Sequence, residues 1–178
     1  MRVIRIFSIL AILFILTLSA SAQKVNVDWD KGVNFQGFRT YAWGNNTPAK
    51  NPLMDQRIVQ GIESQLAAKG LQKVSIQDNP DLIVRYHAAT DTQTQINTID
   101  TGMYGPGWRW GGMGSSTTYV DKIPVGNLVV DIGEFKDKKY IWRATATGTI
   151  SDKPEKNEKT IDKALAKMFE KFPPPLKK

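Results

Sequence analysis

Gly126-Asn-Leu-Val-Val-Asp-Ile-Gly133 and Tyr140-Ile-Trp-Arg-Ala-Thr-Ala-Thr-Gly-Thr149 are the two halves of the stretch that decides the fold. Apolar residues occupy alternate positions in both halves: Leu128, Val130 and Ile132 in the first, and Tyr140, Trp142, Ala144 and Ala146 in the second. Such a repeat is typical of a strand with one buried face, because successive side chains of a strand point to opposite faces. The polar interval 134–139 suits a turn. We therefore expect a β-hairpin at the centre of a sheet.

The remaining chain predicts more strands around this hairpin and two helices. Alternation or apolar runs indicate strands at 23–30, 40–43, 71–76 and 82–88, and the segments 92–99 and 116–123 are polar but β-prone. Asn51 before Pro52 is a typical helix start, Gly70 a typical helix stop, and the spacing between them predicts a helix over 52–69. A second apolar stripe predicts a helix over 155–172, which the prolines 173–175 end.

These elements together predict an α+β fold. We expect a mostly antiparallel sheet of six or seven strands, covered on one face by the two helices as a two-layer sandwich.

The N-terminus is typical of a secretory signal peptide. Arg2 and Arg5 precede an apolar run over 6–18, and Ala20-Ser-Ala22 has the small-x-small pattern of a cleavage site. The run is shorter than the roughly 20 apolar residues that a membrane-spanning helix needs. We expect cleavage after Ala22, with an uncleaved anchor as the alternative. Residues 23–178 then form a single domain without a transmembrane span, periplasmic or secreted.

Composition narrows the possible chemistry. The chain has no cysteine, so it has no disulfide, no thiolate metal site and no lipid-acceptor cysteine after the predicted cut. Its formal net charge of +7 is compatible with anionic surfaces, although ordinary solubility explains it more simply. No basic run has the density of a nucleic-acid patch, and the export signal also argues against nucleic acid.

A glycine- and tryptophan-rich insert at about 102–114 is the candidate contact loop. Large side chains on so flexible a backbone are costly to expose unless something covers them. Tryptophan and tyrosine also anchor interfaces. The candidate contact residues are Met103, Tyr104, Trp108, Arg109, Trp110 and Met113. The alternatives are a flap over the protein's own core or a disordered insert.

No catalytic motif, metal site or cofactor site is predicted. His87 is the single histidine and lacks a partner motif. Asp28 and Asp30 share a strand face, but two carboxylates are too few for a cation. Asp131 and Glu134 are the best carboxylate pair for a hydrolase, yet both are expected to be solvated. We therefore do not expect an enzyme.

Several short segments together resemble the DUF4136 family of bacterial envelope proteins, whose function is unassigned. They are Val25-Asn-Val-Asp-Trp29, Phe35 with Thr40-Tyr-Ala-Trp43, Lys69-Gly-Leu71, Pro80-Asp-Leu-Ile-Val84, Gly126-Asn-Leu-Val-Val-Asp-Ile132, Tyr140-Ile-Trp-Arg143, and Phe172-Pro-Pro174. The resemblance spans nearly all of 23–178. It implies an α+β domain exported to the envelope, often as a lipoprotein, and several such proteins carry a Gly- and aromatic-rich insert. This chain departs from the family by lacking the lipid-acceptor cysteine. The family brings no catalytic residues to carry over.

Three functions follow as hypotheses. The first is a non-catalytic binding or assembly module whose 102–114 loop contacts an envelope protein, a lipid surface or a glycan. The second is a carrier of a small apolar ligand between sheet and helices, which a large apolar pocket would support. The third is a carboxylate-dependent hydrolase of envelope polymers.

Overall fold

The computed structural model describes residues 24–100 and 116–175. The predicted signal peptide (1–22) and the candidate contact loop (102–114) therefore lie outside the described residues. In chain order the elements are β1 (Lys24–Trp29), the short 3-10 helix η1 (Phe35–Gly37), β2 (Thr40–Trp43), α2 (Pro52–Ala68), β3 (Gln72–Lys73), the 3-10 helix η2 (Ile76–Asp78), β4 (Leu82–Asp100), β5 (Ser116–Glu134), β6 (Tyr140–Thr149) and α3 (Pro154–Phe169).

The strands of the described residues form one six-stranded sheet in the order β1-β6-β5-β4-β2-β3. β1, β6, β5 and β4 pair antiparallel, which confirms the predicted hairpin and the mostly antiparallel sheet. β2 pairs in parallel with both β3 and β4. The parallel β2–β3 pair follows from the chain path, because α2 carries the chain back to the edge where it started.

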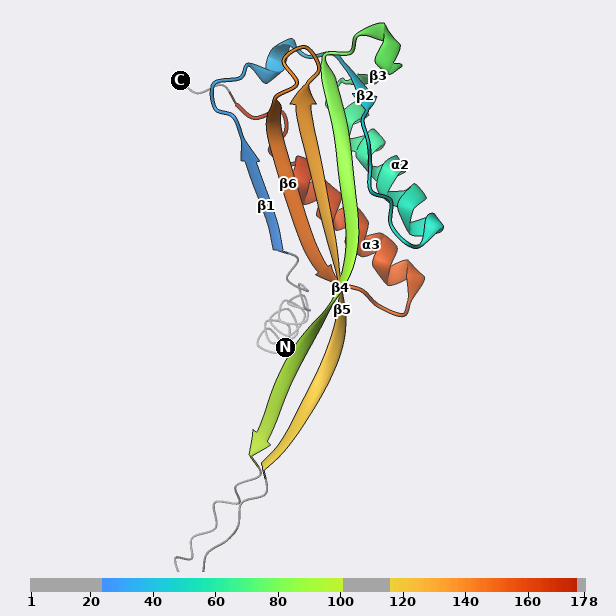
Figure 1. The fold of residues 1–178 in the computed structure, drawn as a ribbon, viewed down its shortest axis with the longest axis vertical. Coiled ribbons are helices and arrows are strands. Elements are labelled where there is room, and N and C mark those ends of the chain that lie inside the picture. The colour runs from blue at the N-terminus through green and yellow to red at the C-terminus, as the bar shows by residue number, and fades with distance from the viewer. Residues whose placement is uncertain (1–23, 101–115, 176–178) are drawn as a thin grey trace, which may run out of the picture.

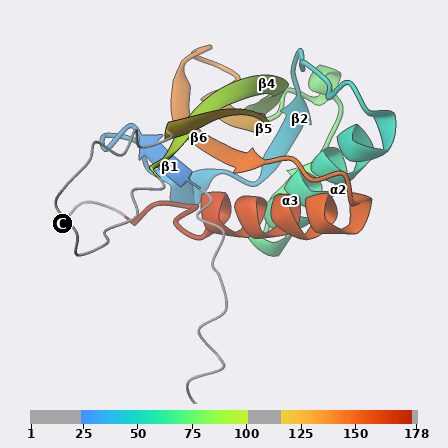
Figure 2. The same cartoon turned by 90° about the horizontal axis from the view of Figure 1, so that it is seen from below.

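Both helices cover the same face of the sheet, as predicted (Figure 2). The side chain of Asn51 accepts hydrogen bonds from the backbone N–H groups of Leu53 and Met54, so the predicted cap forms. Gly70 has a φ of +83° and ends α2 in the left-handed conformation that glycine adopts without strain. The end of the other helix was predicted wrongly: α3 stops at Phe169, before Phe172. Pro173 disfavours helical geometry at the residue before it.

β4 and β5 are much longer than their neighbours. Their pairing continues to Asp100 opposite Ser116, whereas the pairing of β5 with β6 begins only at Val125 opposite Thr149. The polar β-prone segments 92–99 and 116–123 are therefore continuations of the central strands. Together they form a two-stranded ribbon that projects from the domain (Figure 1).

The core is densest at the end of the sandwich where β1 ends and β4 begins. Trp142 is 1% exposed and packs against both Phe169 and Phe172, with ring centroids 5.2 and 5.3 Å away. Phe172 reaches this cluster from the turn after α3 and also contacts Phe35. The predicted alternation holds for Trp142, Ala144 and Ala146, which are buried.

Tyr140 was placed wrongly on the buried face. Its side chain is 52% exposed, and its hydroxyl forms a hydrogen bond with Arg85 on the face that the helices leave open. The cause is an irregularity in the register between Ile132 and Gly133, which breaks the two-residue repeat beside the turn.

Candidate functional site

Side-chain size falls along the helix-covered face of the sheet, from one cross-strand row to the next. Two rows near the dense end pair Val84 with Ile132 and Trp142, and then Tyr86 with Val130 and Ala144. The next two rows consist of Ala88, Leu128 and Ala146, and then of Thr90, Gly126 and Gly148. Because most side chains in these last two rows are small, the sheet leaves space between these rows and the helices.

That space is a cavity of about 340 Å³ between the sheet and the two helices. Ala88, Leu128 and Ala146 form its floor, and Met54, Ile58, Ile161 and Ala164 of the helices line the opposite side. The other lining residues are Thr47, Pro48, Ala49, Lys50, Ala89, Thr90, Gly126, Asn127, Thr147, Gly148, Thr149, Ile150, Asn157 and Thr160. Its volume is in the range of small-molecule sites, roughly 300–1,000 Å³.

One wall of the cavity is the segment between β2 and α2. Thr47 lies along β4: its N–H donates to the carbonyl of Tyr86 at 2.9 Å, and its carbonyl accepts from the N–H of Ala88 at 3.0 Å. The Asp55 carboxylate accepts from the N–H of Ala49 and from the Tyr86 hydroxyl, both at 2.8 Å. Burial and this carboxylate raise the pKa of Tyr86, so the hydroxyl keeps the proton that it donates.

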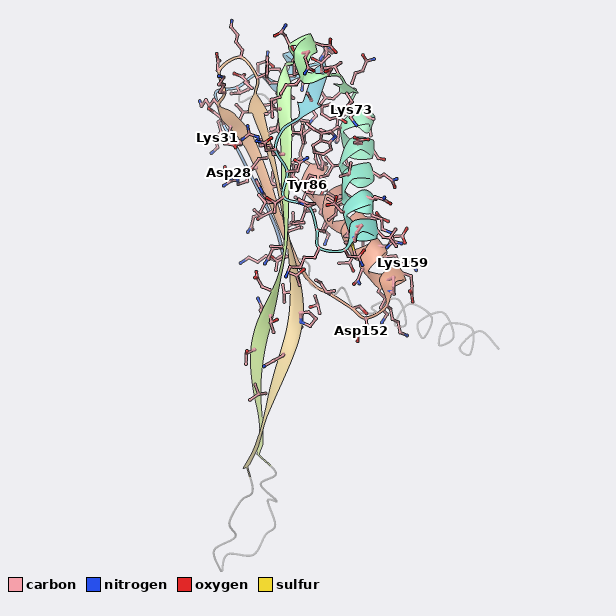
Figure 3. All side chains as sticks on the ribbon, turned by 45° about the vertical axis from the view of Figure 1, so that its right-hand side comes forward. Asp28, Lys31, Lys73, Tyr86, Asp152 and Lys159 are labelled. Atoms are coloured by element: carbon pink, nitrogen blue, oxygen red, sulfur yellow. The ribbon has the colours of Figure 1, made fainter. Side chains whose placement is uncertain are left out.

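Figure 3 shows the Tyr86 side chain between the sheet and α2. From this position its hydroxyl connects β4 to Asp55 in the first turn of the helix. Backbone and side-chain bonds therefore fix this wall before any ligand arrives.

The opposite wall is the connection from β6 to α3. Asn157 of α3 accepts a hydrogen bond from the N–H of Ser151 at 2.8 Å and donates one to the Ser151 carbonyl at 2.7 Å. The N–H of Ile150 donates to the carbonyl of Pro124 at 2.9 Å. Both walls are therefore preformed, which is usual for small-molecule sites.

The cavity reaches the protein surface where its lining residues are themselves exposed, as Pro48, Lys50 and Thr149 are. Among the residues that line it, Lys50 alone carries a charge. The interior therefore favours an apolar group, and its mouth favours an anion.

The contact residues Met103, Tyr104, Trp108, Arg109, Trp110 and Met113 all lie outside the described residues. They connect the two strands of the projecting ribbon, as the chain order requires.

The carboxylate pair Asp131 and Glu134 has structural partners. Asp131, expected to be solvated, is 1% exposed, and its two oxygens accept from Nε and Nη2 of Arg143 at 2.5 and 2.9 Å. Asp131 is buried because Arg143, its register partner on β6, covers it. Burial and a hydrogen bond with Asp137 raise the pKa of Glu134.

Other polar residues singled out in the sequence also have local partners. His87 Nδ1 lies 2.8 Å from the Thr47 hydroxyl. Asp30 forms an ion pair with Lys139 at 2.5 Å, and Asp28 accepts from the N–H of Trp29 at 2.9 Å. Residues 24–100 and 116–175 contain no cluster of three or more metal-ligating side chains. No helix among these residues has the length and apolar character needed to cross a bilayer.

The sequence did not predict that the residues around the cavity form a binding site. Ala146 was predicted only as part of a buried face, and Gly126 and Gly148 only as parts of the hairpin. The available signal was the row of small residues, but it becomes visible only when the register places Gly126 opposite Gly148.

Comparison with known proteins identifies the class. The fold is a two-layer α+β domain, and the DUF4136 family model, a domain of unknown function, matches residues 25–174. The chain belongs to this family. No curated protein shows significant sequence similarity to it.

Three solved structures share the fold. A DUF4136 family protein from Bacteroides thetaiotaomicron matches with a TM-score of 0.56 and 16% identity, over 85% of this chain and 96% of that one. A PDZ domain protein from Parabacteroides distasonis matches with a TM-score of 0.54 and 15% identity, over 90% of this chain but 39% of the other. PelC from Paraburkholderia phytofirmans, a dodecamer, matches with a TM-score of 0.50 and 14% identity, over 83% of this chain and 95% of that one.

Proposed function

We propose that this protein is a non-catalytic binding module of the bacterial cell envelope that holds one fatty-acyl chain in the cavity between sheet and helices. The observation that carries the proposal is the cavity itself, about 340 Å³, created by rows of small residues on an otherwise well-filled face. The envelope location rests on the predicted signal peptide. Of the three hypotheses from the sequence, the apolar carrier has the most support from the geometry.

The chemistry of the lining favours a chain with an acidic head. Aliphatic side chains from β4, β5, β6 and both helices surround the interior, so a hydrocarbon gains free energy by leaving water there. Lys50 is exposed at the mouth. An ammonium at that position suits the carboxylate of a fatty acid and leaves the chain to enter the cavity.

The carboxylates also favour a non-catalytic function. Asp131 is held on both oxygens by Arg143, and it lies on the face of the sheet opposite the cavity. A hydrolase would need an accessible pair flanking its substrate.

The test is a titration of the protein with a fluorescent fatty acid such as dansyl-undecanoic acid. Ala146→Phe places a ring inside the cavity, and the matched control Thr145→Phe places the same ring on the other face of the same strand. We expect Ala146→Phe to weaken binding by at least about tenfold, equivalent to about 1.4 kcal/mol, and Thr145→Phe to leave it unchanged. Equal binding by both variants, or none by the unaltered protein, would overturn the proposal.

A second titration examines the mouth. Lys50→Gln is expected to weaken binding of decanoic acid but not of decanol, because only the acid carries a charge for Lys50 to attract. Equal weakening of both ligands would contradict the assignment of the acidic head to Lys50.

The projecting ribbon favours a second candidate function, contact with an envelope partner. β4 and β5 continue beyond β6 as a two-stranded ribbon, and residues 101–115 join its strands. A photo-crosslinking residue at Trp108 tests this, with Lys163 on the exposed side of α3 as the control position. One dominant adduct from Trp108 alone would support a contact loop, whereas equal adducts from both positions would count against it.

A further inference from the structure

A second hollow, of about 400 Å³, lies on the face of the sheet that the helices leave open. Its lining includes Arg85 of β4, Tyr140 of β6, Lys138 of the β5–β6 turn and Ile76 of η2. Tyr140 is 52% exposed and Ile76 is 44% exposed, so two of the large apolar side chains that this protein leaves in water border the hollow.

Arg85 has no carboxylate partner among the described residues. It pairs in register with Asp131, but both oxygens of that carboxylate are engaged by Arg143. Its Nε is buried and has no hydrogen-bond acceptor in the described part of the chain. Unmet donors in a buried group are costly, and a carboxylate is a strong hydrogen-bond acceptor for a guanidinium.

The surroundings hold the Arg85 side chain in place. A Cβ at Gly44 would come within 2.7 Å of Nε and 2.9 Å of Cγ, so glycine leaves the space that the arginine occupies. On the other side Nη1 forms a hydrogen bond with the Tyr140 hydroxyl, and Cζ lies 5.5 Å from the centre of that ring. The guanidinium is thus ordered against an aromatic face before any ligand binds.

Lys138 adds a second cation in an unusual backbone conformation. Its φ is +51°, a left-handed geometry that is unfavourable for a residue with a Cβ. It has no ion-pair partner among the described residues, whereas its neighbour Lys139 binds Asp30. The acidic group that lines the hollow, Glu134, forms a hydrogen bond with Asp137 and is not paired with Arg85 or Lys138.

We propose that this hollow binds a small carboxylic acid with a ring-shaped body. The carboxylate binds the Arg85 guanidinium and approaches Lys138, and the ring packs against Tyr140 and Ile76. An aromatic acid and an acidic sugar share this chemistry. The site goes beyond the proposed function, because it lies on the opposite face of the sheet from the acyl-chain cavity.

The test is a titration of the full domain followed by backbone amide NMR, with benzoate, glucuronate and the uncharged benzamide as probes. We expect benzoate or glucuronate to shift the amide signals of Gly133, Lys138 and Tyr140, and benzamide to shift none of them. The response to the two acids identifies the source of the carboxylate. No shift with either acid, or an equal shift with benzamide, would overturn the proposal.

Matched variants separate binding from folding. Arg85→Gln should weaken the acid by at least about tenfold, as expected for the loss of a charged hydrogen-bond pair, and Arg57→Gln on α2 should have no effect. Lys138→Gly relieves the left-handed strain, so it should weaken binding while the domain stays folded, and Lys136→Gly in the same turn is its control. Unchanged affinity in both Arg85→Gln and Lys138→Gly would refute the site.

Ala146→Phe makes failure here distinguishable from failure of the acyl-chain proposal. It fills the cavity on the helix-covered face and should leave benzoate and glucuronate binding unchanged. If it abolishes their binding, the acids enter the cavity and the hollow is not their site.

Discussion

The two ends of the helix-covered face are built from the same strands and helices, yet one end is filled and the other is hollow. At the filled end Trp142 packs on Phe169 and Phe172. Three rows further along the same strands, Gly126 lies opposite Gly148 and the helices stand over a cavity. The comparison teaches that alternation decides which face of a strand is buried, whereas side-chain volume decides whether the buried space is filled.

The largest expected effect is at the filled end. Trp142→Ala should lower the free energy of unfolding by about 3–5 kcal/mol, because truncation of a fully buried aromatic residue loses transfer free energy and leaves a cavity. Leu128→Ala, beside the existing cavity, should cost about 2 kcal/mol or less, because the side chain has fewer neighbours to lose. Urea denaturation measures both. Equal losses at the two positions would remove the distinction between the ends.

On the open face of the filled end, the stability of the domain depends on the ion pair between Arg143 and Asp131. Arg143→Met should lower the free energy of unfolding by about 2–4 kcal/mol, because it leaves Asp131 buried without its cation. The value lies below that for a fully buried pair, since the Arg143 side chain is 59% exposed. Arg57→Met is the control: its ion pair with Glu158 is partly exposed, and its loss should cost less than about 1 kcal/mol.

Two alanines on one face of β6 give the most direct comparison of filled and hollow space. Ala144→Leu should destabilise the domain by about 1–3 kcal/mol through overpacking, because Ala144 is 0% exposed in a filled row. Ala146→Leu should change stability by less than about 0.5 kcal/mol, since the cavity receives the larger side chain. Thermal unfolding of the two variants measures the difference. A comparable loss in Ala146→Leu would mean that the cavity has no room for added atoms.

The smallest effect concerns pH at the filled end, where Asp81 joins the starts of β2 and β4. Hydrogen bonds from the N–H groups of Arg39 and Thr40 at 2.8 and 2.9 Å lower the pKa of Asp81. This stabilisation is present above the unfolded pKa, near 3.8, and is lost as the pH falls through the lower folded pKa. Asp81→Asn should cost about 1 kcal/mol at neutral pH and reduce the loss of stability on acidification.

Glu134 is a control whose pKa shifts in the opposite direction. Burial and a hydrogen bond with Asp137 raise its pKa. The contribution of Glu134 to stability is present below its unfolded pKa and is lost as the pH rises through its folded pKa. Glu134→Gln should therefore stabilise the domain slightly at neutral pH. Denaturant unfolding at pH 3 to 7 distinguishes the two groups, and parallel pH profiles of the two variants would contradict both assignments.

Much of the fold could be predicted because its signals are local. The cap at Asn51, the proline at the first turn of α2 and the left-handed stop at Gly70 depend on residues within a few positions of each other. Alternation at Leu128, Val130 and Ile132 likewise needs only one strand. The family resemblance was confirmed by the match over residues 25–174.

The candidate site and the surroundings of individual polar residues were far less predictable, because both are defined by neighbours on other strands. Asp131 was expected in solvent, but Arg143 on β6 buries it. Tyr140 was expected in the core, but the register irregularity after Ile132 turns it toward Arg85. In each case the deciding contact joins residues that only strand pairing brings together.

By itself the sequence determined the main strands and both helices, the buried face of most of these elements, and where α2 begins and ends, because these properties follow from short-range periodicity and backbone preference. Only the tertiary structure decided the mixed strand order, the length of the β4–β5 ribbon, and the positions of the cavity and of the hollow on the open face. These depend on register, which places Gly126 beside Gly148 and Gly44 beside Arg85. The space that small residues leave becomes a cavity only after distant segments have packed around it.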